Sequence, residues 1–338
     1  MRHRFMLTAL LCALALLGAS PNYHVLRKIH LGGPGFWDYL TADPAARRLY
    51  VSHGKHVMVV DLDTGKVVGD IPDTEGVHGI AVADDLGRGF TSNGRANDVT
   101  IFDLKTLRTI GTVATGTNPD CIQYDPATKR VFAFNGGSNS ATVIDAATGK
   151  VLSTIPLGGK PEFAQPDGGG RIYNNLEDKS QVVEIDSRAM KVLHTWPLAP
   201  CQSPSGMGID AAHHRLFIGC HNGMMAVVDA TSGTVLATPP IGAGVDGNGF
   251  DPGTGYAFSS NGRDGTLTVV AETSPGKFDA VETVTTQRAA RTMTVDTKTH
   301  NIYLTTAELG PPVAATADNP HPHPTMVTDS FTLLVVGR

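Results

Sequence analysis

The chain has 338 residues, of which 41% are hydrophobic and 17% are charged, so it can bury a sizeable core. Its formal net charge is −5, which argues against general binding to phosphate backbones, because such binding needs basic surface patches. Glycine (38 residues) and proline (21 residues) are abundant and spread evenly, which indicates many turns rather than one disordered tail.

The first twenty residues differ from the rest. A basic start, "MRHRF", is followed by the apolar "MLTALLCALALLG" and by the small residues "AS". This order is typical of a secretory signal peptide, and the apolar stretch is short for a membrane span. We therefore expect residues 1–20 to be removed on export, leaving a periplasmic or secreted protein of residues 21–338 with no membrane span. Its formal charge would be −7, because Arg2 and Arg4 are lost and no acid is.

After residue 20, one pattern of four short apolar runs recurs. In one copy, "GIAVA" (79–83) leads through a turn into the aromatic-bearing run "RGFTSN" (88–93), and two further runs follow. The turn after the first run falls at one acidic residue per unit: Asp43, Asp84, Asp125, Asp167, Asp210, Asp251 and Asp296. The steps between them are 41, 41, 42, 43, 41 and 45 residues. Units of this length and composition predict an all-β, seven-bladed β-propeller with four antiparallel strands per blade.

The two ends of the chain predict how the ring closes. The last unit has only three runs and ends in "FTLLVVG" (331–337). The N-terminal "YHVLRKIHL" (23–31) matches fourth runs such as "KVLSTIPLGG" (150–159). We expect the N-terminal strand to complete the C-terminal blade, which leaves no open sheet edge where the ring closes and makes residues 21–338 one domain.

The units resemble the forty-residue YVTN β-propeller repeat, and the chain is similar to YncE-like exported proteins. The resemblance is carried by "RLYVSHGKHVMVVDLDTGKVVGDI" (48–71) and "GIAV" (79–82), and it covers nearly everything after residue 20. It implies the propeller fold and little about activity, since the family serves varied binding roles. Single-stranded nucleic-acid binding has been associated with YncE-like proteins, but the low basicity and sparse aromatic loops argue against it here.

Acidic residues also recur at the end of the third run in five of the units, before turns such as "DTGK": Asp61, Asp103, Asp145, Asp186 and Asp229. Aspartate side chains accept backbone N–H groups in such turns. A role repeated in every blade is architectural, whereas an active site is usually singular. We therefore interpret these aspartates as structural.

In an antiparallel blade, the start of strand one and the end of strand two share a face, opposite the aspartate turns. The residues that start strand one differ from blade to blade: Asp38, His78, Asp120, Glu162, Ser205, Asp246 and Arg291. The ends of strand two add His53, Asn93, Asn135, His221 and Asn261. We predict that these residues form a polar ligand-binding funnel at one mouth of the ring, because they depart from the repeat symmetry. The alternative is that they are merely solvated residues of a wet channel.

We favour an exported, monomeric binding protein that uses this funnel for a small ligand or a protein partner. The alternative is a metal-dependent lyase or hydrolase, in which Asp38, His53 and His78 bind a divalent metal as cofactor. The seven-bladed streptogramin lyases, which resemble this architecture, use a metal and a histidine base. The sequence contains no nucleophile elbow, phosphate loop or haem-attachment motif.

Three cysteines remain after residue 20, so they cannot all pair internally. Cys201 precedes the first run of the fifth unit and Cys220 ends its second, which predicts a disulfide on the funnel face; two separate buried thiols are the alternative. Cys121 is expected to be a buried free thiol. The last unit carries a long insertion (307–330) with His321 and His323, which should emerge on the funnel face as a lid, a partner-binding segment or a solvated loop.

Overall fold

A computed structural model describes residues 20–311 and 325–338. Residues 1–19, which hold nearly all of the expected signal peptide, lie outside the described part, as do His321 and His323 of the long insertion. Within the described residues, no helix has the length and apolar character needed to cross a membrane.

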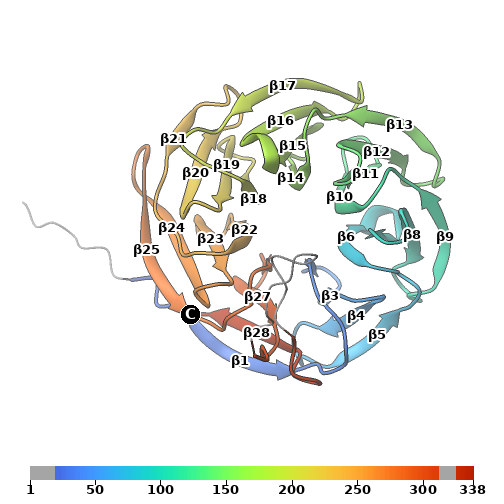
Figure 1. The fold of residues 1–338 in the computed structure, drawn as a ribbon, viewed down its shortest axis with the longest axis horizontal. Helices are drawn as coiled ribbons and strands as arrows, with labels where there is room; N and C mark the ends of the chain where they lie inside the picture. Colours follow the sequence, from blue (N-terminus) through green and yellow to red (C-terminus); the bar gives the residue numbers. More distant parts are fainter. Residues whose placement is uncertain (1–19, 312–324) are drawn as a thin grey trace, which may run out of the picture.

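The chain forms seven antiparallel four-stranded sheets arranged around a ring (Figure 1), which confirms the predicted propeller. Blades 1 to 3 consist of β2 (Leu40–Asp43), β3 (Arg48–His53), β4 (His56–Asp61) and β5 (Val67–Ile71); β6 (Val77–Ala83), β7 (Arg88–Asn93), β8 (Asp98–Asp103) and β9 (Thr109–Ala114); and β10 (Pro119–Asp125), β11 (Arg130–Asn135), β12 (Ser140–Asp145) and β13 (Val151–Pro156).

Blades 4 and 5 consist of β14 (Pro161–Pro166), β15 (Arg171–Leu176), β16 (Gln181–Asp186) and β17 (Lys191–Pro197); and β18 (Pro204–Asp210), β19 (Arg215–Cys220), β20 (Met224–Asp229) and β21 (Val235–Ala237). Blade 6 consists of β22 (Val245–Asp251), β23 (Tyr256–Asn261), β24 (Thr266–Ser274) and β25 (Lys277–Thr285), and blade 7 of β26 (Met293–Asp296), β27 (Asn301–Thr306), β28 (Thr332–Gly337) and β1 (His24–His30). Two short 3-10 turns, η1 (Asp84–Leu86) and η2 (Glu177–Lys179), complete the elements.

The ring closes as predicted, with the N-terminal strand in the C-terminal blade. Strand β1 pairs antiparallel with β28, from His24 opposite Gly337 to His30 opposite Thr332. In Figure 1 the blue β1 lies along the outside of the red β28. The last sheet therefore has its full four strands, and the two ends of the chain hold each other in place.

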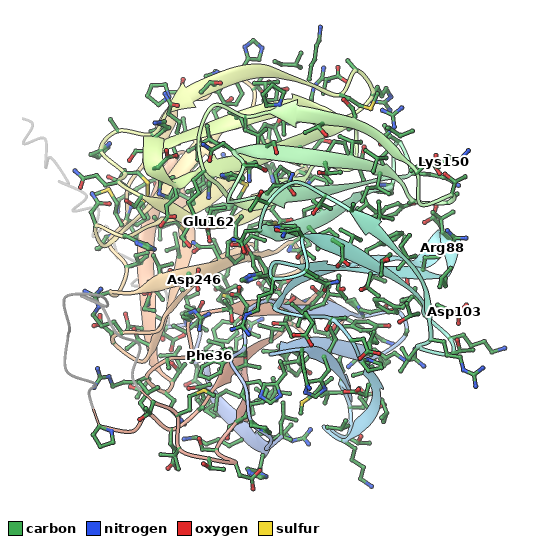
Figure 2. The ribbon with its side chains drawn as sticks, turned by 45° about the vertical axis from the view of Figure 1, so that its right-hand side comes forward. Phe36, Arg88, Asp103, Lys150, Glu162 and Asp246 are labelled. Atoms are coloured by element: carbon green, nitrogen blue, oxygen red, sulfur yellow. A yellow bond between two sulfur atoms is a disulfide. The ribbon has the colours of Figure 1, made fainter. Side chains whose placement is uncertain are left out.

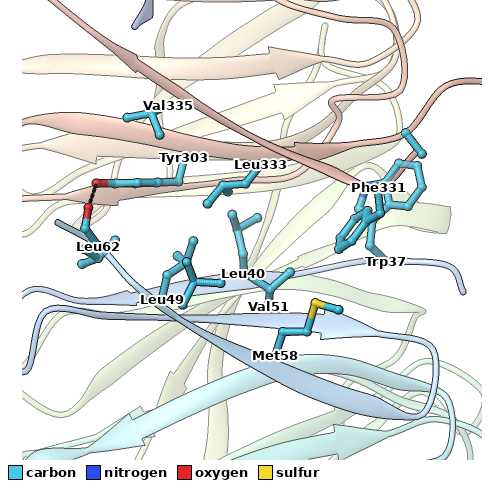
Figure 3. Close-up of a cluster of buried hydrophobic side chains, with 12 residues drawn as sticks. Trp37, Leu40, Leu49, Val51, Met58, Leu62, Tyr303, Phe331, Leu333 and Val335 are labelled. Atoms are coloured by element: carbon cyan, nitrogen blue, oxygen red, sulfur yellow. Dashed lines mark hydrogen bonds between the residues drawn. The ribbon is translucent and has the colours of Figure 1, made fainter. Parts of the chain in front are cut away.

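The core lies between blades, because the second and third strands of each blade are covered on both faces. In the seam between blades 1 and 7, Leu49 and Val51 face Leu333, and Phe331 lies against Trp37 with 5.4 Å between ring centroids (Figure 3). In β3 every residue from Leu49 to His53 is buried for this reason, including the polar Ser52 and His53.

One face of the ring, the turn face, carries the aspartates that end the third strands of blades 1 to 5. Asp145 Oδ1 accepts hydrogen bonds from the Thr148 hydroxyl and backbone N–H, both at 2.7 Å. The same carboxylate-to-backbone bond forms in the other blades, for Asp61, Asp103, Asp186 and Asp229. The hydrogen bonds from Thr148 lower the pKa of Asp145. These contacts agree with a structural role for the repeated aspartates.

The opposite face, the funnel face, is built on a repeated irregularity of strand one. Val77 pairs with Asn93, but the register then shifts before Ile80, so that His78 and Gly79 form a bulge. The same shift occurs in the next four blades, where it contains Asp120, Glu162, Ser205 and Asp246. Bulges re-aim side chains and are frequent beside functional sites. Five of the seven predicted strand-one residues are therefore presented by one backbone feature.

Candidate functional site

Side chains from strand two hold the bulges in place. Gly79 N donates to Ser92 Oγ at 2.9 Å, and Asn174 Nδ2 donates to the Glu162 carbonyl at 2.8 Å. In blade 1, Asp38 N donates to Ser52 Oγ at 2.9 Å. Since the backbone groups of these irregular segments are satisfied, the side chains they carry are fixed before any ligand arrives.

Five of the predicted funnel residues meet in one charged cluster, which we call the ring cluster: Asp38, His78, Asp120, Asp246 and Arg291. His78 Nδ1 lies 2.6 Å from Asp38 Oδ2 and 3.7 Å from Asp120 Oδ1. Arg291 Nε donates to Asp246 Oδ2 at 2.7 Å, and its Nη2 lies 3.5 Å from Asp38 Oδ1. Asp38 is thus shared between a histidine and an arginine. Figure 2 shows Asp246, Glu162 and Phe36 on one side of the molecule and Asp103 and Lys150 on the other.

Burial and mutual charge shift the pKa values in this cluster. Burial lowers the pKa of His78, but the hydrogen bond that its ring donates to Asp38 and the negative charges of Asp120 and Asp38 outweigh it and raise this pKa to about 9. Burial, together with the nearby Asp38 carboxylate, raises the pKa of Asp120 to about 7. Burial likewise raises the pKa of Asp246, against the effect of Arg291. These shifts favour the charged form of His78 and the neutral form of Asp120.

Glu162 lies apart from the ring cluster, on the neighbouring blade. Lys160 Nζ lies 2.5 Å from Glu177 Oε2 and 3.7 Å from Glu162 Oε2. Burial, with Asp120 nearby, raises the pKa of Glu162 well above its usual value. Beneath these acids the rings of Tyr39 and Phe163 pack with centroids 4.4 Å apart. Both rings also line a separate cavity of about 550 Å³ formed by the first strands of the blades.

A larger pocket of about 950 Å³, the funnel pocket, opens beside the ring cluster over blade 1. Asp38, His78 and Arg291 lie in its lining. Its other walls are two insertions that interrupt the repeat: the segment "GGPGFW" (32–37) and the stem of the 307–330 insertion, where Leu309 pairs with Met326. The pocket is thus off-centre, where the ends of the chain meet.

Three predicted funnel residues have structural roles instead. Asn93 Nδ2 donates to Asp98 Oδ1 and Thr100 Oγ1, at 2.7 and 2.8 Å. Asn135 and Asn261 make the corresponding bonds to strand three of their own blades. All three are buried and hold the hairpin between strands two and three. They lie outside the funnel-pocket lining. This role was not evident from the sequence, because the asparagine occurs at this position in only some of the blades.

The two remaining histidines also differ from expectation. His53 lines the pocket but is fully buried, stacked on Phe331 with 4.3 Å between centroids, and burial lowers its pKa to about 4. His221 is exposed in the turn after β19 and lies outside the funnel-pocket lining. The predicted trio of Asp38, His53 and His78 is not the one that the fold brings together. The donor atoms that lie within 4.8 Å of one another belong to Asp38, His78 and Asp120.

Sequence reasoning missed the apolar half of the pocket. Phe36 is 57% exposed and Trp37 is buried below it, while Leu309 and Met326 form the facing edge. Arg291 lies over the Trp37 ring, with its guanidinium carbon 5.8 Å from the centroid. The usable signal was the Gly- and Pro-rich segment before the first strand, which has no counterpart in the other units.

The cysteines divide as the sequence suggested. Cys201 and Cys220 form a disulfide at the funnel face of blade 5. Cys121 is a buried free thiol, and burial raises its pKa to about 12. Such a thiol is not a nucleophile at neutral pH.

No protein-family model matches this chain, and no curated protein matches it in sequence. Among solved structures, it is similar to "Kuenenia stuttgartiensis Hydrazine Synthase", with a TM-score of 0.71 at 16% sequence identity, over 82% of this chain and 93% of that chain. At this identity the similarity shows a shared fold and carries no activity across. The chain is a seven-bladed β-propeller, and its membership of the YVTN family stays a prediction.

Proposed function

We propose that this chain is an exported binding protein of the YVTN, YncE-like type, which holds a small organic ligand in the funnel pocket. One observation carries the proposal: a cavity of about 950 Å³ joins the apolar walls of Phe36, Leu309 and Met326 to the polar floor of Asp38, His78 and Arg291. Small-molecule sites are typically cavities of this size, mostly apolar, with a few fixed polar groups. Export is supported by the character of residues 1–20.

The polar floor is pre-organised, which favours binding. The His78 ring is fixed through Nδ1 by Asp38, and Arg291 is fixed by Asp246 and by the Trp37 carbonyl, to which Nη2 donates at 3.0 Å. A ligand that meets these groups does not have to order them, so less of its interaction energy is lost.

A methyl group added at Gly94 would displace two side chains that line this pocket, those of Asn118 and His78. A Cβ there would lie 2.6 Å from Asn118 Oδ1 and 2.7 Å from His78 Nε2. Gly136 occupies the same position after strand two in blade 3, and there a Cβ would meet nothing closer than 3.5 Å. Gly94→Ala and Gly136→Ala therefore form a matched pair, of which only the first obstructs the site.

The test is a thermal-shift screen of small organic compounds against the processed protein and both variants. We expect at least one compound to raise the melting temperature of both the wild type and the control variant Gly136→Ala. The same compound should have little effect on the melting temperature of Gly94→Ala. Compounds that stabilise all three proteins equally would place binding elsewhere and contradict the proposal.

A metal-dependent lyase or hydrolase is the second candidate. It is favoured by the three donors of Asp38, His78 and Asp120 within 4.8 Å and by Asp120 Oδ1, a buried atom with no hydrogen-bond partner among the described residues. Carboxylate with imidazole suits a divalent ion. Metal analysis of tag-free protein decides between the candidates: one bound ion per chain, lost in His78→Ala, would favour the enzyme. Protein that stays metal-free after incubation with Zn²⁺, Mn²⁺ or Mg²⁺ would exclude it.

A further inference from the structure

Among the side chains that line the funnel pocket, permanent cations outnumber carboxylates, while two further carboxylates, those of Asp120 and Asp246, lie just behind the lining. Three permanent cations line the pocket, Lys55, Arg95 and Arg291, against two carboxylates, those of Asp38 and Glu75. The whole chain has a formal charge of −5. Cations in such a cavity attract anions where no carboxylate already balances their charge.

Two of these cations are available to a ligand. Arg291 is engaged by Asp246 and Asp38. Lys55 and Arg95, by contrast, are exposed and have no ion pair with any residue that the structure describes. An anion that binds at this side of the pocket would therefore meet cations whose charge is not already balanced.

Arg95 directly follows Gly94, whose lack of a Cβ makes room for the side chains of Asn118 and His78. A Cβ on Gly76, which has φ +67°, would lie 2.6 Å from Arg95 Cγ, so the base of this side chain packs on the pocket lip. A Cβ on Gly94 would touch Asn118 Oδ1 and His78 Nε2. Since Gly94 has no unusual backbone angle, space rather than conformation requires the glycine. One end of the pocket thus combines a guanidinium, an amide and an imidazole nitrogen.

The other side of the pocket is apolar. Phe36 presents a ring that is 57% exposed, and its carbonyl accepts a hydrogen bond from Gly54 N at 2.7 Å, which anchors the segment. Leu309 and Met326, from the paired stem of the insertion, complete this side. An aromatic or aliphatic body several carbons across would be needed to cover these groups.

We propose that the funnel pocket binds an amphipathic organic carboxylate, with its carboxylate at the Arg95–His78 end and its apolar body against Phe36, Leu309 and Met326. This inference rests on the proposed binding function and names its ligand class. Arginine suits this role because its planar fork of N–H donors matches both oxygens of a carboxylate.

The experiment titrates three probes into the protein of residues 21–338 by calorimetry: naphthylacetate, naphthylacetamide and naphthylethylamine. The acid and the amide have nearly the same shape and differ in charge, while the amine carries a cationic end on the same naphthyl body. We expect the carboxylate to bind about tenfold or more tightly than the amide, as hydrogen bonds to charged groups contribute more than neutral ones, and the amine to bind least.

The sequence itself supplies a matched control for Arg95. The motif "SNGR" occurs twice, at 92–95 and 260–263, and Arg263 packs on Gly244 (φ +74°) as Arg95 packs on Gly76, but outside the pocket lining. Both arginines are exposed, so Arg95→Glu and Arg263→Glu should fold equally well. We expect Arg95→Glu to weaken naphthylacetate binding more than tenfold, and Arg263→Glu to change it less than about twofold.

The outcomes separate this inference from the function on which it rests. If the amide or the amine binds as tightly as the carboxylate, and Gly94→Ala abolishes that binding, the pocket is a ligand site and the carboxylate preference is wrong. The same holds if Arg95→Glu and Arg263→Glu have equal effects. If no probe binds, the ligand class is wrong, while the compound screen with Gly94→Ala still decides whether the pocket binds anything.

Discussion

The two faces of this propeller use the same repeat in opposite ways. On the turn face, Asp61, Asp103 and Asp145 each accept the hydrogen bonds of a threonine at the next turn, with nearly identical geometry. On the funnel face, one repeated bulge carries a different side chain in every blade in which it occurs, as His78 and Asp120 show. Each face thus repeats one backbone feature from blade to blade. The side chains at that feature are the same on the turn face and different on the funnel face.

This difference separates residues that the fold requires from residues whose identity the fold does not explain. Uniform side chains at a uniform position satisfy the requirements of the turn itself. Unequal side chains at a uniform position cannot be explained by the backbone, because the bulge accepts histidine, serine and carboxylates alike. Their interactions are instead with one another and with the pocket beside them. Four perturbations test whether the two faces differ in this way.

The largest expected effect comes from the disulfide, a covalent link on the funnel face. Replacing Cys201 and Cys220 by serine removes a bridge between residues 19 positions apart. Chain-entropy estimates give a loss of about 3 kcal/mol in the free energy of unfolding for a loop of this size. Urea unfolding of the wild type and the double variant, each with and without reductant, measures it. Reductant should lower the free energy of unfolding of the wild type and leave that of the double variant unchanged. A wild type whose unfolding free energy does not respond to reductant would contradict the expectation.

Arg291→Met should have the next largest effect. The change leaves Asp246 and Asp38 without their guanidinium partner in a largely enclosed cluster. We expect a loss of about 2 kcal/mol, less than for a fully buried pair, because 35% of the Arg291 side chain is exposed. Adding Asp246→Asn to Arg291→Met should recover part of the loss. Equal stability of the single variant and the wild type would show that the ring cluster is not coupled.

The ring cluster should also make stability depend on pH. His78 has a folded-state pKa of about 9 against an ordinary 6.5, so its contribution is complete below about pH 6.5 and is lost as the pH rises through 9. Asp120, with its pKa raised to about 7, acts in the same direction between about pH 4 and 7. The groups that face His78 are Asp38, Asp120 and Arg291.

We expect the unfolding free energy to fall by about 1 to 2 kcal/mol between about pH 6.5 and 9.5, a value reduced from the full shift because 30% of His78 is exposed. Asp38→Asn should shrink this fall, since it replaces the charged acceptor that raises the pKa of His78 by a neutral one. Unfolding curves across pH, with NMR titration of the His78 ring, provide the measurement. A ring that titrates near 6.5 in the wild type would refute the assignment.

The smallest effect is expected on the turn face. Asp145→Ala removes two hydrogen bonds to Thr148 at an accessible turn, which should cost about 0.5 to 1 kcal/mol. Ligand binding in the funnel pocket should not change, because Asp145 lies at the opposite end of its strand from the bulged face. A binding defect in Asp145→Ala would remove the distinction between the faces.

The fold could be predicted from the sequence because each blade repeats the same apolar runs and turn residues, so errors in one unit are corrected by the others. Closure followed from counting runs at the two ends. The site was predicted only in part: Asp38, His78, Asp120 and Arg291 meet because their position in the repeat fixes their position in the ring.

The rest of the site depended on information that the repeat does not contain. Asn93 and His53 end strand two on the predicted face, yet their side chains turn into the blade, toward Thr100 and Phe331. Phe36 and Met326 come from insertions without counterparts, whose paths are set by contacts between blades 1 and 7. Strand parity predicts a face, whereas side-chain packing decides which residues on it are accessible.

Hydrogen–deuterium exchange of the protein of residues 21–338, with and without saturating naphthylacetate, tests the central claim most directly, because it reports on both faces at once. We expect naphthylacetate to slow amide exchange in residues 32–38 and 76–80, around the funnel pocket. Exchange at the aspartate turns 61–66, 103–108 and 145–150 should not change. Protection confined to those turns, or spread equally over both faces, would contradict the claim that the unequal face is the binding face.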